Sequence, residues 1–272
     1  MNNRPIGVFD SGLGGLTAVK ELRKILPGED IVYFGDTGRV PYGPRGRDII
    51  VQYARQDIRF LLSQNVKCVM AACGTVSSTY PAEEAAALPV PYTGVVRAAA
   101  EAAAATSQNG KIGVIGTAAT IKSGSYERLL HALRPDAQLY TRACPMFVPL
   151  VENGYVDDGN PVTKLIVEEY LSGIRAAGVD TLILGCTHYP LLKKAIGDFV
   201  GDEVTLIDPG KITAHALKRT LEESGLLADP RSTGGSARFY VSDSTAEFEA
   251  MADLFLGAYR GGRVEQIAID KY

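Results

Sequence analysis

The sequence lacks the features that mark membrane-spanning, exported or nucleic-acid-binding proteins. No run approaches the roughly 18 uninterrupted apolar residues of a membrane span, and Met1 to Arg4 leads into a strand-like segment rather than a signal sequence. Neither charge dominates, because 28 Lys and Arg stand against 31 Asp and Glu, for a net charge of -3. We therefore expect a cytoplasmic protein whose partner is neither a membrane nor a nucleic acid.

Cysteine is also scarce, and its spacing excludes two common uses. The four cysteines are Cys68, Cys73, Cys144 and Cys186, and a reducing compartment would keep them as free thiols. They form no C-x-x-C pair, and Cys186 with the nearby His188 supplies too few ligands for a tetrahedral zinc site. We expect neither a disulfide nor a structural metal.

Short apolar runs alternate with helical patterns along the chain. A length of 272 residues, 46% of them hydrophobic, suits two compact units better than one. Short apolar strands that alternate with helices indicate parallel sheets covered on both faces, so the predicted fold class is α/β. The strand-like runs are residues 5–9, 31–34, 66–71, 92–96, 112–115, 182–184 and 204–207, and the helical patterns are 16–26, 49–63, 126–133 and 162–177.

Two segments of the first half resemble two of the second, which indicates an internal repeat. Residues 7–11 and 113–117 each read as a strand ending in a hydroxyl residue. Residues 66–75 and 179–187 each read as a strand followed by a small residue, a cysteine and a nearby threonine. In open α/β sheets, ligands bind at the carboxyl ends of strands. Two pseudo-symmetric halves facing each other would therefore place one cysteine on each side of a cleft.

The domain boundaries follow from this repeat. An alanine-rich helix at 95–110 and the stretch after Pro209 mark the junctions. We expect a first domain of residues 1–96 with 211–272, and a second of 97–210. In the C-terminal part, strand-like 237–241 and helix-like 245–259 are expected to pack on the first half.

Equivalent placement separates two cysteines from the other two. A free cysteine is usually a small buried hydrophobe, and we interpret Cys68 and Cys144 in that way. Cys73 and Cys186 share a repeat position, which favours a chemical role. Asp10 ends an apolar strand, where a charge needs a specific partner or a solvated cleft. His188 follows Cys186 by two residues and could exchange a proton with its thiol.

The glycine-rich turn after the first strand does not match a nucleotide fingerprint. Gly12-Leu13-Gly14-Gly15 departs from G-x-G-x-x-G, so it favours a tight turn that brings backbone N–H groups to an anionic ligand such as a carboxylate. By themselves, Pro41-Tyr42-Gly43 would be a rigid loop and Glu152 an acid at a helix end.

Taken together, these segments resemble bacterial glutamate racemases of the aspartate/glutamate racemase superfamily, over nearly the whole chain. The resemblance implies two pseudo-symmetric α/β domains with the site between them, no cofactor, a homodimer, and D-glutamate made for peptidoglycan synthesis. It implies that Cys73 and Cys186 are the acid/base pair, assisted by Asp10, His188 and Glu152. It assigns substrate contacts to Asp10, Ser11, Pro41, Tyr42, Gly43, Gly74, Thr75, Thr117, Thr187 and His188. The segments that carry it are residues 7–16, 36–37, 41–43, 72–75, 116–117 and 184–190.

One position departs from the family. Asparagine usually follows the first cysteine, where this chain has Gly74. Glycine and asparagine both accept a left-handed backbone, so we expect a positive φ at Gly74. An asparagine there would then add a substrate contact that this chain lacks.

The chemistry of racemisation explains why two thiols are needed. The α-proton of an amino acid is feebly acidic, so a base must remove it while donors stabilise the charge on the carboxylate. Inversion also needs a proton from the opposite face, which a second cysteine supplies. Three alternatives remain: a cysteine hydrolase, which leaves Cys73 without a role; a non-catalytic amino-acid-binding protein; and a racemase of aspartate or a hydantoin.

Overall fold

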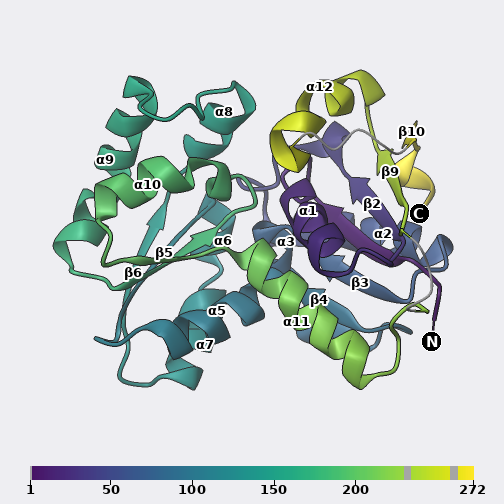
Figure 1. Ribbon diagram of the computed structural model, residues 1–272, viewed down its shortest axis with the longest axis horizontal. Helices are drawn as coiled ribbons and strands as arrows, with labels where there is room; N and C mark the ends of the chain where they lie inside the picture. The colour runs from purple at the N-terminus through teal and green to yellow at the C-terminus, as the bar shows by residue number, and fades with distance from the viewer. Residues whose placement is uncertain (1, 230–233, 258–262) are drawn as a thin grey trace.

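The computed structural model describes residues 2–229, 234–257 and 263–272. Two parallel sheets, each flanked by helices, lie side by side (Figure 1). In the part of the chain described, the first sheet has the order β10-β9-β2-β1-β3-β4 and the second β6-β5-β7-β8. Neighbouring strands in both sheets are parallel. The predicted α/β class is confirmed.

The elements alternate along the chain as the sequence pattern predicts. The strands are β1 Ile6–Asp10, β2 Ile31–Gly35, β3 Cys68–Ala71, β4 Tyr92–Gly94, β5 Lys111–Gly116, β6 Gln138–Ala143, β7 Thr181–Gly185, β8 Thr205–Ile207, β9 Ala237–Val241 and β10 Val264–Gln266. The α-helices are α1 Leu16–Ile25, α2 Arg47–Ser63, α3 Gly74–Thr79, α4 Ala82–Ala86, α5 Val95–Thr106, α6 Ala118–Lys122, α7 Ser125–Leu133, α8 Phe147–Glu152, α9 Pro161–Ala176, α10 Lys193–Val200, α11 Pro209–Glu223 and α12 Thr245–Leu256. Short 3-10 helices span Thr37–Arg39, Tyr189–Leu192 and Ile269–Lys271.

The two sheets repeat one strand order, which confirms the internal repeat. The order β2-β1-β3-β4 in the first sheet corresponds to β6-β5-β7-β8 in the second. The predicted pairs are therefore equivalent: β1 with β5, β3 with β7, and β4 with β8. Cys73 follows β3, and Cys186 follows β7. Each half thus presents one cysteine at the carboxyl end of an equivalent strand.

The C-terminal part extends the first sheet. Strand β9 pairs with β2, and helix α12 packs against α1, as expected. Helix α11 contacts both α1 and α5. We keep the division into residues 1–96 with 211–272 and residues 97–210 as a proposal for the two domains. The last part of the helix expected to reach Tyr259 lies outside the described residues.

Two described strands were not expected from the sequence. Strand β6 lies at the edge of the second sheet, and none of its six residues is fully buried. Strand β10 is three residues long and also lies at an edge. An edge strand has a weak pattern of apolar residues because one of its sides faces solvent. Neither strand was therefore predicted from the sequence.

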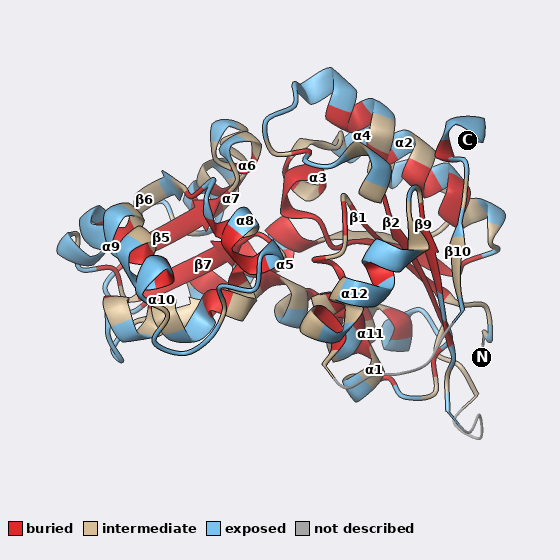
Figure 2. Ribbon diagram, turned by 90° about the horizontal axis from the view of Figure 1, so that it is seen from above, coloured by how far each residue is buried: buried red, intermediate tan, exposed pale blue. Residues whose placement is uncertain are grey.

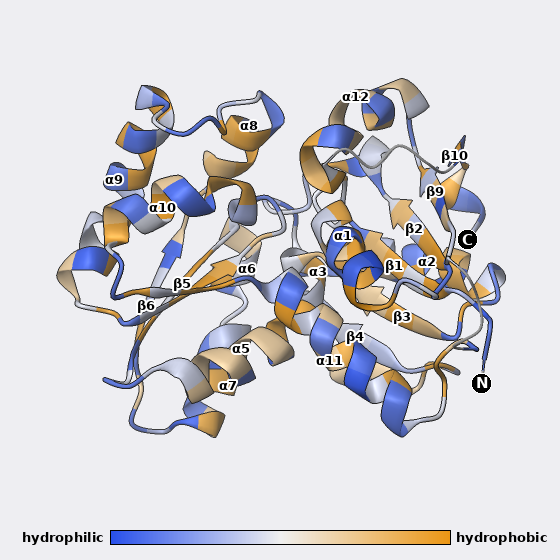
Figure 3. Cartoon of the chain, in the orientation of Figure 1, coloured by the Kyte–Doolittle hydropathy of each residue, from blue (hydrophilic) through white to orange (hydrophobic). Residues whose placement is uncertain are grey.

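The central strands form the core of each half. Strands β1, β2, β3 and β7 are buried at every position. Figures 2 and 3 show these buried, apolar strands between helices that carry both buried apolar and exposed polar residues. Helix α2 packs through an apolar face that includes Ile50, Ala54 and Ile58, at the spacing of an amphipathic helix. The buried face of α2 also contains Asp57.

Candidate active site

The neighbours of the two cysteines touch across the two halves. Cys73 precedes α3 and Cys186 follows β7, and both are buried. Gly74 lies so near Gly185 that a Cβ on Gly74 would overlap the Gly185 carbonyl oxygen. The carboxyl ends of β3 and β7 therefore face each other, with the residue next to one thiol against the residue next to the other.

Asp10 and Ser11 surround Cys73. The Asp10 carboxylate accepts a hydrogen bond from the Gly12 amide at 3.0 Å through Oδ2, and within the described residues its buried Oδ1 has no hydrogen-bond partner. Burial raises the pKa of Asp10, while His188 and backbone amides oppose the shift. The Cys73 thiol donates to Ser11 Oγ at 3.4 Å. Burial, and then the charge of Asp10, raises the pKa of Cys73 to about 12, so Cys73 is a protonated thiol at neutral pH.

Cys186 has a different environment. His188 Nδ1 lies 3.9 Å from Cys186 Sγ, and His188 Nε2 lies 3.1 Å from Glu152 Oε1. Burial lowers the pKa of His188, but hydrogen bonds to Cys186 and Glu152 outweigh it and raise the pKa to about 10. His188 is therefore an imidazolium at neutral pH, and its Nδ1 faces the sulfur of Cys186.

Threonine hydroxyls from both halves meet beside the cysteines. Thr75 Oγ1 lies 2.9 Å from Thr117 Oγ1, and Thr187 Oγ1 lies 3.4 Å from His188 Nδ1. Thr117 also contacts Thr120 Oγ1 at 3.0 Å. Sequence reasoning missed Thr120, although its position three residues after Thr117, at the start of a helix, is a capping pattern. These hydroxyls are available donors for a carboxylate.

The loop of residues 41–43 reaches from the first half to the second. The Gly43 carbonyl accepts a hydrogen bond from the Ala119 amide at 3.0 Å. Pro41 is exposed and follows a cis peptide bond, whereas the Tyr42 side chain is buried. Because the Tyr42 hydroxyl contacts Asp36 and Asp57, only the backbone of Tyr42 is free to reach a ligand.

The expectation of a positive φ at Gly74 is wrong. Gly74 is the first residue of α3 and is not among the described residues with a positive φ. The position requires glycine for a different reason, which is the close approach of the Gly185 backbone from the other half. The two halves fit together only because Gly74 has no side chain.

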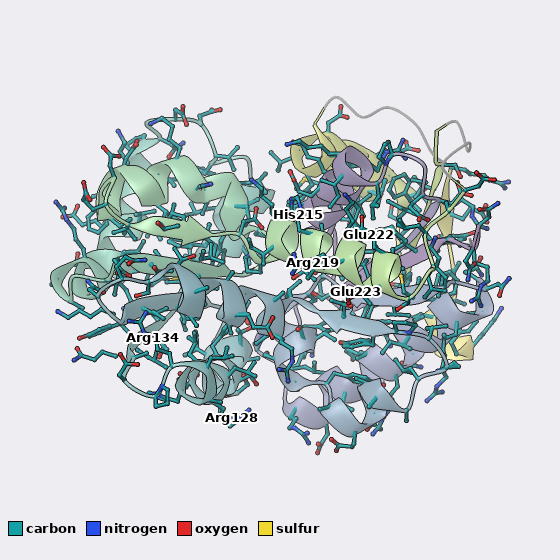
Figure 4. The ribbon with its side chains drawn as sticks, turned by 60° about the horizontal axis from the view of Figure 1, so that its bottom comes forward. Arg128, Arg134, His215, Arg219, Glu222 and Glu223 are labelled. Carbon is teal, nitrogen blue, oxygen red and sulfur yellow. The ribbon has the colours of Figure 1, made fainter. Side chains whose placement is uncertain are left out.

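Two cavities differ in size and place. One of about 10 Å³ is lined by Gly74, Cys186 and Thr187, among others. A second, of about 1490 Å³, lies away from both cysteines. Its lining includes Arg219 and Glu223 of α11 and Arg128 of α7, which Figure 4 labels. The larger cavity is therefore separate from the site around the thiols.

Within residues 2–229, 234–257 and 263–272, no group of three or more His, Cys, Asp or Glu side chains is placed to hold a metal ion. No helix in these ranges has both the length and the apolar character needed to cross a bilayer.

Known proteins resemble this chain over almost its full length. The Asp/Glu/Hydantoin racemase family matches residues 18–217. A glutamate racemase of Geobacter metallireducens is 43% identical over 267 residues, which are 98% of this chain and 97% of that protein. One of Neisseria meningitidis is 44% identical and covers 93% of each chain. The crystal structure of the Francisella tularensis glutamate racemase in complex with D-glutamate matches with a TM-score of 0.91 and 38% identity over 100% of both chains. This chain belongs to the Asp/Glu/Hydantoin racemase family.

Proposed function

We propose that this chain is a glutamate racemase that moves the α-proton of glutamate between Cys73 and Cys186, without a cofactor. The observation that carries the proposal is the contact between Gly74 and Gly185, each adjacent to one of the two cysteines. A thiol on each side of one site can remove a proton from one face of the α-carbon and return one to the other. The 43% identical glutamate racemase supports glutamate over aspartate as the substrate.

The unlike surroundings of the two cysteines suit this chemistry. Cys73, beside Asp10, is a thiol ready to donate a proton. Cys186, beside the His188 imidazolium, can act as a thiolate that accepts one. After one turnover the two sulfurs have exchanged protonation states, and the same groups serve the reverse reaction.

Asp10 and His188 are proposed to assist the cysteine next to each of them. Asp10 can take the proton of Cys73 when that thiol must act as the base, because burial raises the pKa of Asp10 toward the working range. His188, as an imidazolium, can give a proton to the Cys186 thiolate when that sulfur must act as the acid, and Glu152 holds the His188 ring through Nε2. Each assisting group thus returns its cysteine to the protonation state that the next turnover needs.

The substrate carboxylates need hydrogen-bond donors, since negative charge grows on the α-carboxylate as the proton leaves. The groups proposed to bind them are the hydroxyls of Ser11, Thr75, Thr117 and Thr187, with the backbone at Pro41, Tyr42, Gly43 and Gly74. Thr75 and Thr117 come from opposite halves and already lie 2.9 Å apart. A carboxylate placed between the halves would therefore find donors on both.

The product, D-glutamate, would supply peptidoglycan synthesis in the cytoplasm, and we propose a homodimer as the assembly. All four cysteines are free thiols, and the reaction needs two of them reduced, which supports a reducing compartment.

Circular dichroism of purified protein incubated with L-glutamate or L-aspartate tests the function. We expect decay of the L-glutamate signal to zero and slower or no change with L-aspartate. In D₂O, the early product should carry deuterium while the remaining substrate stays protiated, because two separate bases handle the two faces. Loss of signal with aspartate alone, or equal early labelling of both enantiomers, would contradict the proposal.

A further inference from the structure

A buried group of ionisable side chains lies behind the loop of residues 41–43. It consists of Asp36, Arg39, Tyr42 and Asp57. Asp36 and Asp57 have no exposed surface, and Tyr42 is 1% exposed. The partly exposed guanidinium of Arg39 therefore faces two carboxyl groups that lie out of water, where an unpaired charge is costly.

The two carboxyl groups differ in how many donors they receive. Asp36 accepts hydrogen bonds from Ser242 Oγ at 2.7 Å, from Arg39 Nε at 2.6 Å and from the Tyr42 hydroxyl. Asp57 accepts one from a guanidinium nitrogen of Arg39 at 3.0 Å, through Oδ1. Its Oδ2 lies 3.3 Å from the Tyr42 hydroxyl. Asp36 is therefore the fully satisfied carboxylate of the pair.

The Tyr42 hydroxyl carries one proton but touches two carboxyl oxygens. It donates that proton to Asp36, its nearer partner, so the contact with Asp57 becomes a hydrogen bond only if Asp57 supplies a second proton. We propose that Asp57 is a positioning residue that stays protonated and donates to the Tyr42 hydroxyl, which in turn donates to Asp36. This ordered chain makes the group electrically neutral, with one carboxylate opposite one guanidinium.

The charges around Asp57 support this assignment. Asp36 and Arg39 follow β2, Tyr42 lies on the loop, and Asp10 lies at the end of β1. Burial, and then the charge of Asp36, raises the pKa of Asp57 well above its usual range, with a further contribution from Asp10. Arg39 and Tyr42 oppose the shift without reversing it.

The chain of hydrogen bonds positions a loop of the proposed site, so this inference rests on the proposed function. With its hydroxyl held, the Tyr42 ring packs against Tyr53, with ring centroids 5.2 Å apart. The next residue, Gly43, meets Ala119 of the other half. The Asp36 amide also donates to the Asp10 carbonyl at 3.1 Å. Asp57 therefore acts on the substrate through the Tyr42–Gly43 backbone without touching it.

Two substitutions of Asp57 distinguish a protonated donor to Tyr42 from an ionised partner of Arg39. In Asp57→Asn, the amide can donate to Tyr42 and its oxygen can accept from Arg39, so kcat and KM should stay within about twofold of wild type. In Asp57→Ala, the hydroxyl loses its donor and we expect KM for glutamate to rise about tenfold with a smaller change in kcat. Asp48→Asn and Asp48→Ala, at an exposed position of the same helix, are the matched controls.

Stability gives a readout that does not depend on activity. When the pKa of a carboxyl group in the folded protein lies above its unfolded value of about 3.9, the protein loses stability as pH rises from the unfolded value to the folded one. Asp57→Asn removes that loss, so its Tm should exceed that of wild type at pH 8 by about 3 °C, and the difference should shrink toward pH 4. A lower Tm for Asp57→Asn at pH 8 would show that Asp57 is ionised and would overturn the proposal.

Hydrogen exchange of the 41–46 segment tests the positioning itself. We expect faster amide exchange at Tyr42 and Gly43 in Asp57→Ala and wild-type exchange in Asp57→Asn. Unchanged exchange and KM in Asp57→Ala would show that Asp57 does not position the loop. These stability and exchange results stand whether or not glutamate proves to be the substrate, so failure of the proposed function is seen separately in the racemisation assay. If Asp57→Ala does not fold, the Tm of Asp57→Asn against pH still decides the protonation state.

Discussion

Gly74 and Gly185 meet backbone to backbone between the two halves, and any side chain on Gly74 would overlap the Gly185 carbonyl oxygen. An asparagine at this position, which the resemblance to glutamate racemases implies, is therefore incompatible with the arrangement of this chain. Residue 74 adjoins one cysteine and residue 185 the other, so a displacement here changes the distance between the two proton carriers. Correct placement of reacting groups is worth several kcal/mol in enzyme reactions.

We expect Gly74→Asn to lower kcat/KM for glutamate by about tenfold or more, because backbone must shift to accept the side chain. This is the opposite of the gain that the family pattern alone suggests. The racemisation assay measures the effect. Gly46→Asn is the matched control, since a Cβ on Gly46 meets nothing within 4 Å. Activity of Gly74→Asn at or above wild type would show that the close approach is unimportant.

Each of the two proposed cysteines should be indispensable. Cys73→Ala and Cys186→Ala should each reduce racemisation by at least about a hundredfold, because a positioned acid or base contributes roughly 10²–10⁴-fold. Far-ultraviolet circular dichroism would check that the fold is kept. Cys68→Ala and Cys144→Ala, which alter the other two buried thiols, should remain active. A Cys73 or Cys186 variant with more than about a hundredth of wild-type activity would contradict the two-base scheme.

Glu152 should set the alkaline limit of activity through His188. The folded pKa of His188 is raised to about 10, so the stability from its charge is present below the unfolded value of about 6.5 and is lost as pH rises through 10. Removing the Glu152 charge should lower the pKa of His188 and move both this loss and the alkaline fall in kcat/KM to lower pH. The measurement is the pH profile of Glu152→Gln between pH 7 and 11. Glu169→Gln, at an exposed position of α9, is the control and should leave the profile unchanged. An unshifted profile in Glu152→Gln would show that Glu152 does not influence the titration of His188.

The buried pair of Lys67 and Glu29 should matter for stability and not for catalysis. The Lys67 ammonium bonds Glu29 and the Asn2 carbonyl, while Glu29 accepts from the Ala228 amide at 2.8 Å. Lys67→Met leaves a buried carboxylate unpaired and should cost about 3–5 kcal/mol of unfolding free energy. Urea denaturation measures this loss, and kcat/KM of the folded fraction should be unchanged.

A second substitution tests the origin of that loss. Adding Glu29→Gln to Lys67→Met removes the unpaired charge and should restore much of the stability. Lys194→Met, which breaks an exposed pair with Asp198, should change stability little. Equal losses of unfolding free energy in Lys67→Met and in the double variant with Glu29→Gln would show that packing, and not charge, is responsible.

Much of this fold follows from local patterns in the sequence. Buried parallel strands read as continuous apolar runs, and the repeat placed Cys73 and Cys186 at equivalent strand ends. Strand β6 was missed because none of its residues is fully buried. The φ of Gly74 was predicted wrongly because this residue begins helix α3 and takes the helical conformation. The need for glycine there comes from the approach of Gly185, which no pattern around residue 74 can reveal.

The network behind the loop was missed for a related reason. Asp36, Arg39 and Tyr42 are close in sequence, but their partner Asp57 lies on helix α2. A signal was present, since Asp57 falls among the buried residues Ala54, Ile58 and Leu61 of that helix. A carboxyl group on an apolar helix face needs a partner, although the sequence does not say which one.

The small cavity beside Cys186 has a kinetic consequence. A space of about 10 Å³ holds one water molecule at most, so under the proposed function an amino acid would reach Cys186 only after the halves separate. The apparent dissociation constant then equals the intrinsic one divided by the fraction of molecules that are open. A substitution that loosens the contact of Gly43 with Ala119 would raise that fraction and speed substrate capture. The same substitution would slow the closing of the two halves that each turnover needs. The rate of racemisation is therefore expected to be greatest when the contact between Gly43 and Ala119 has an intermediate strength.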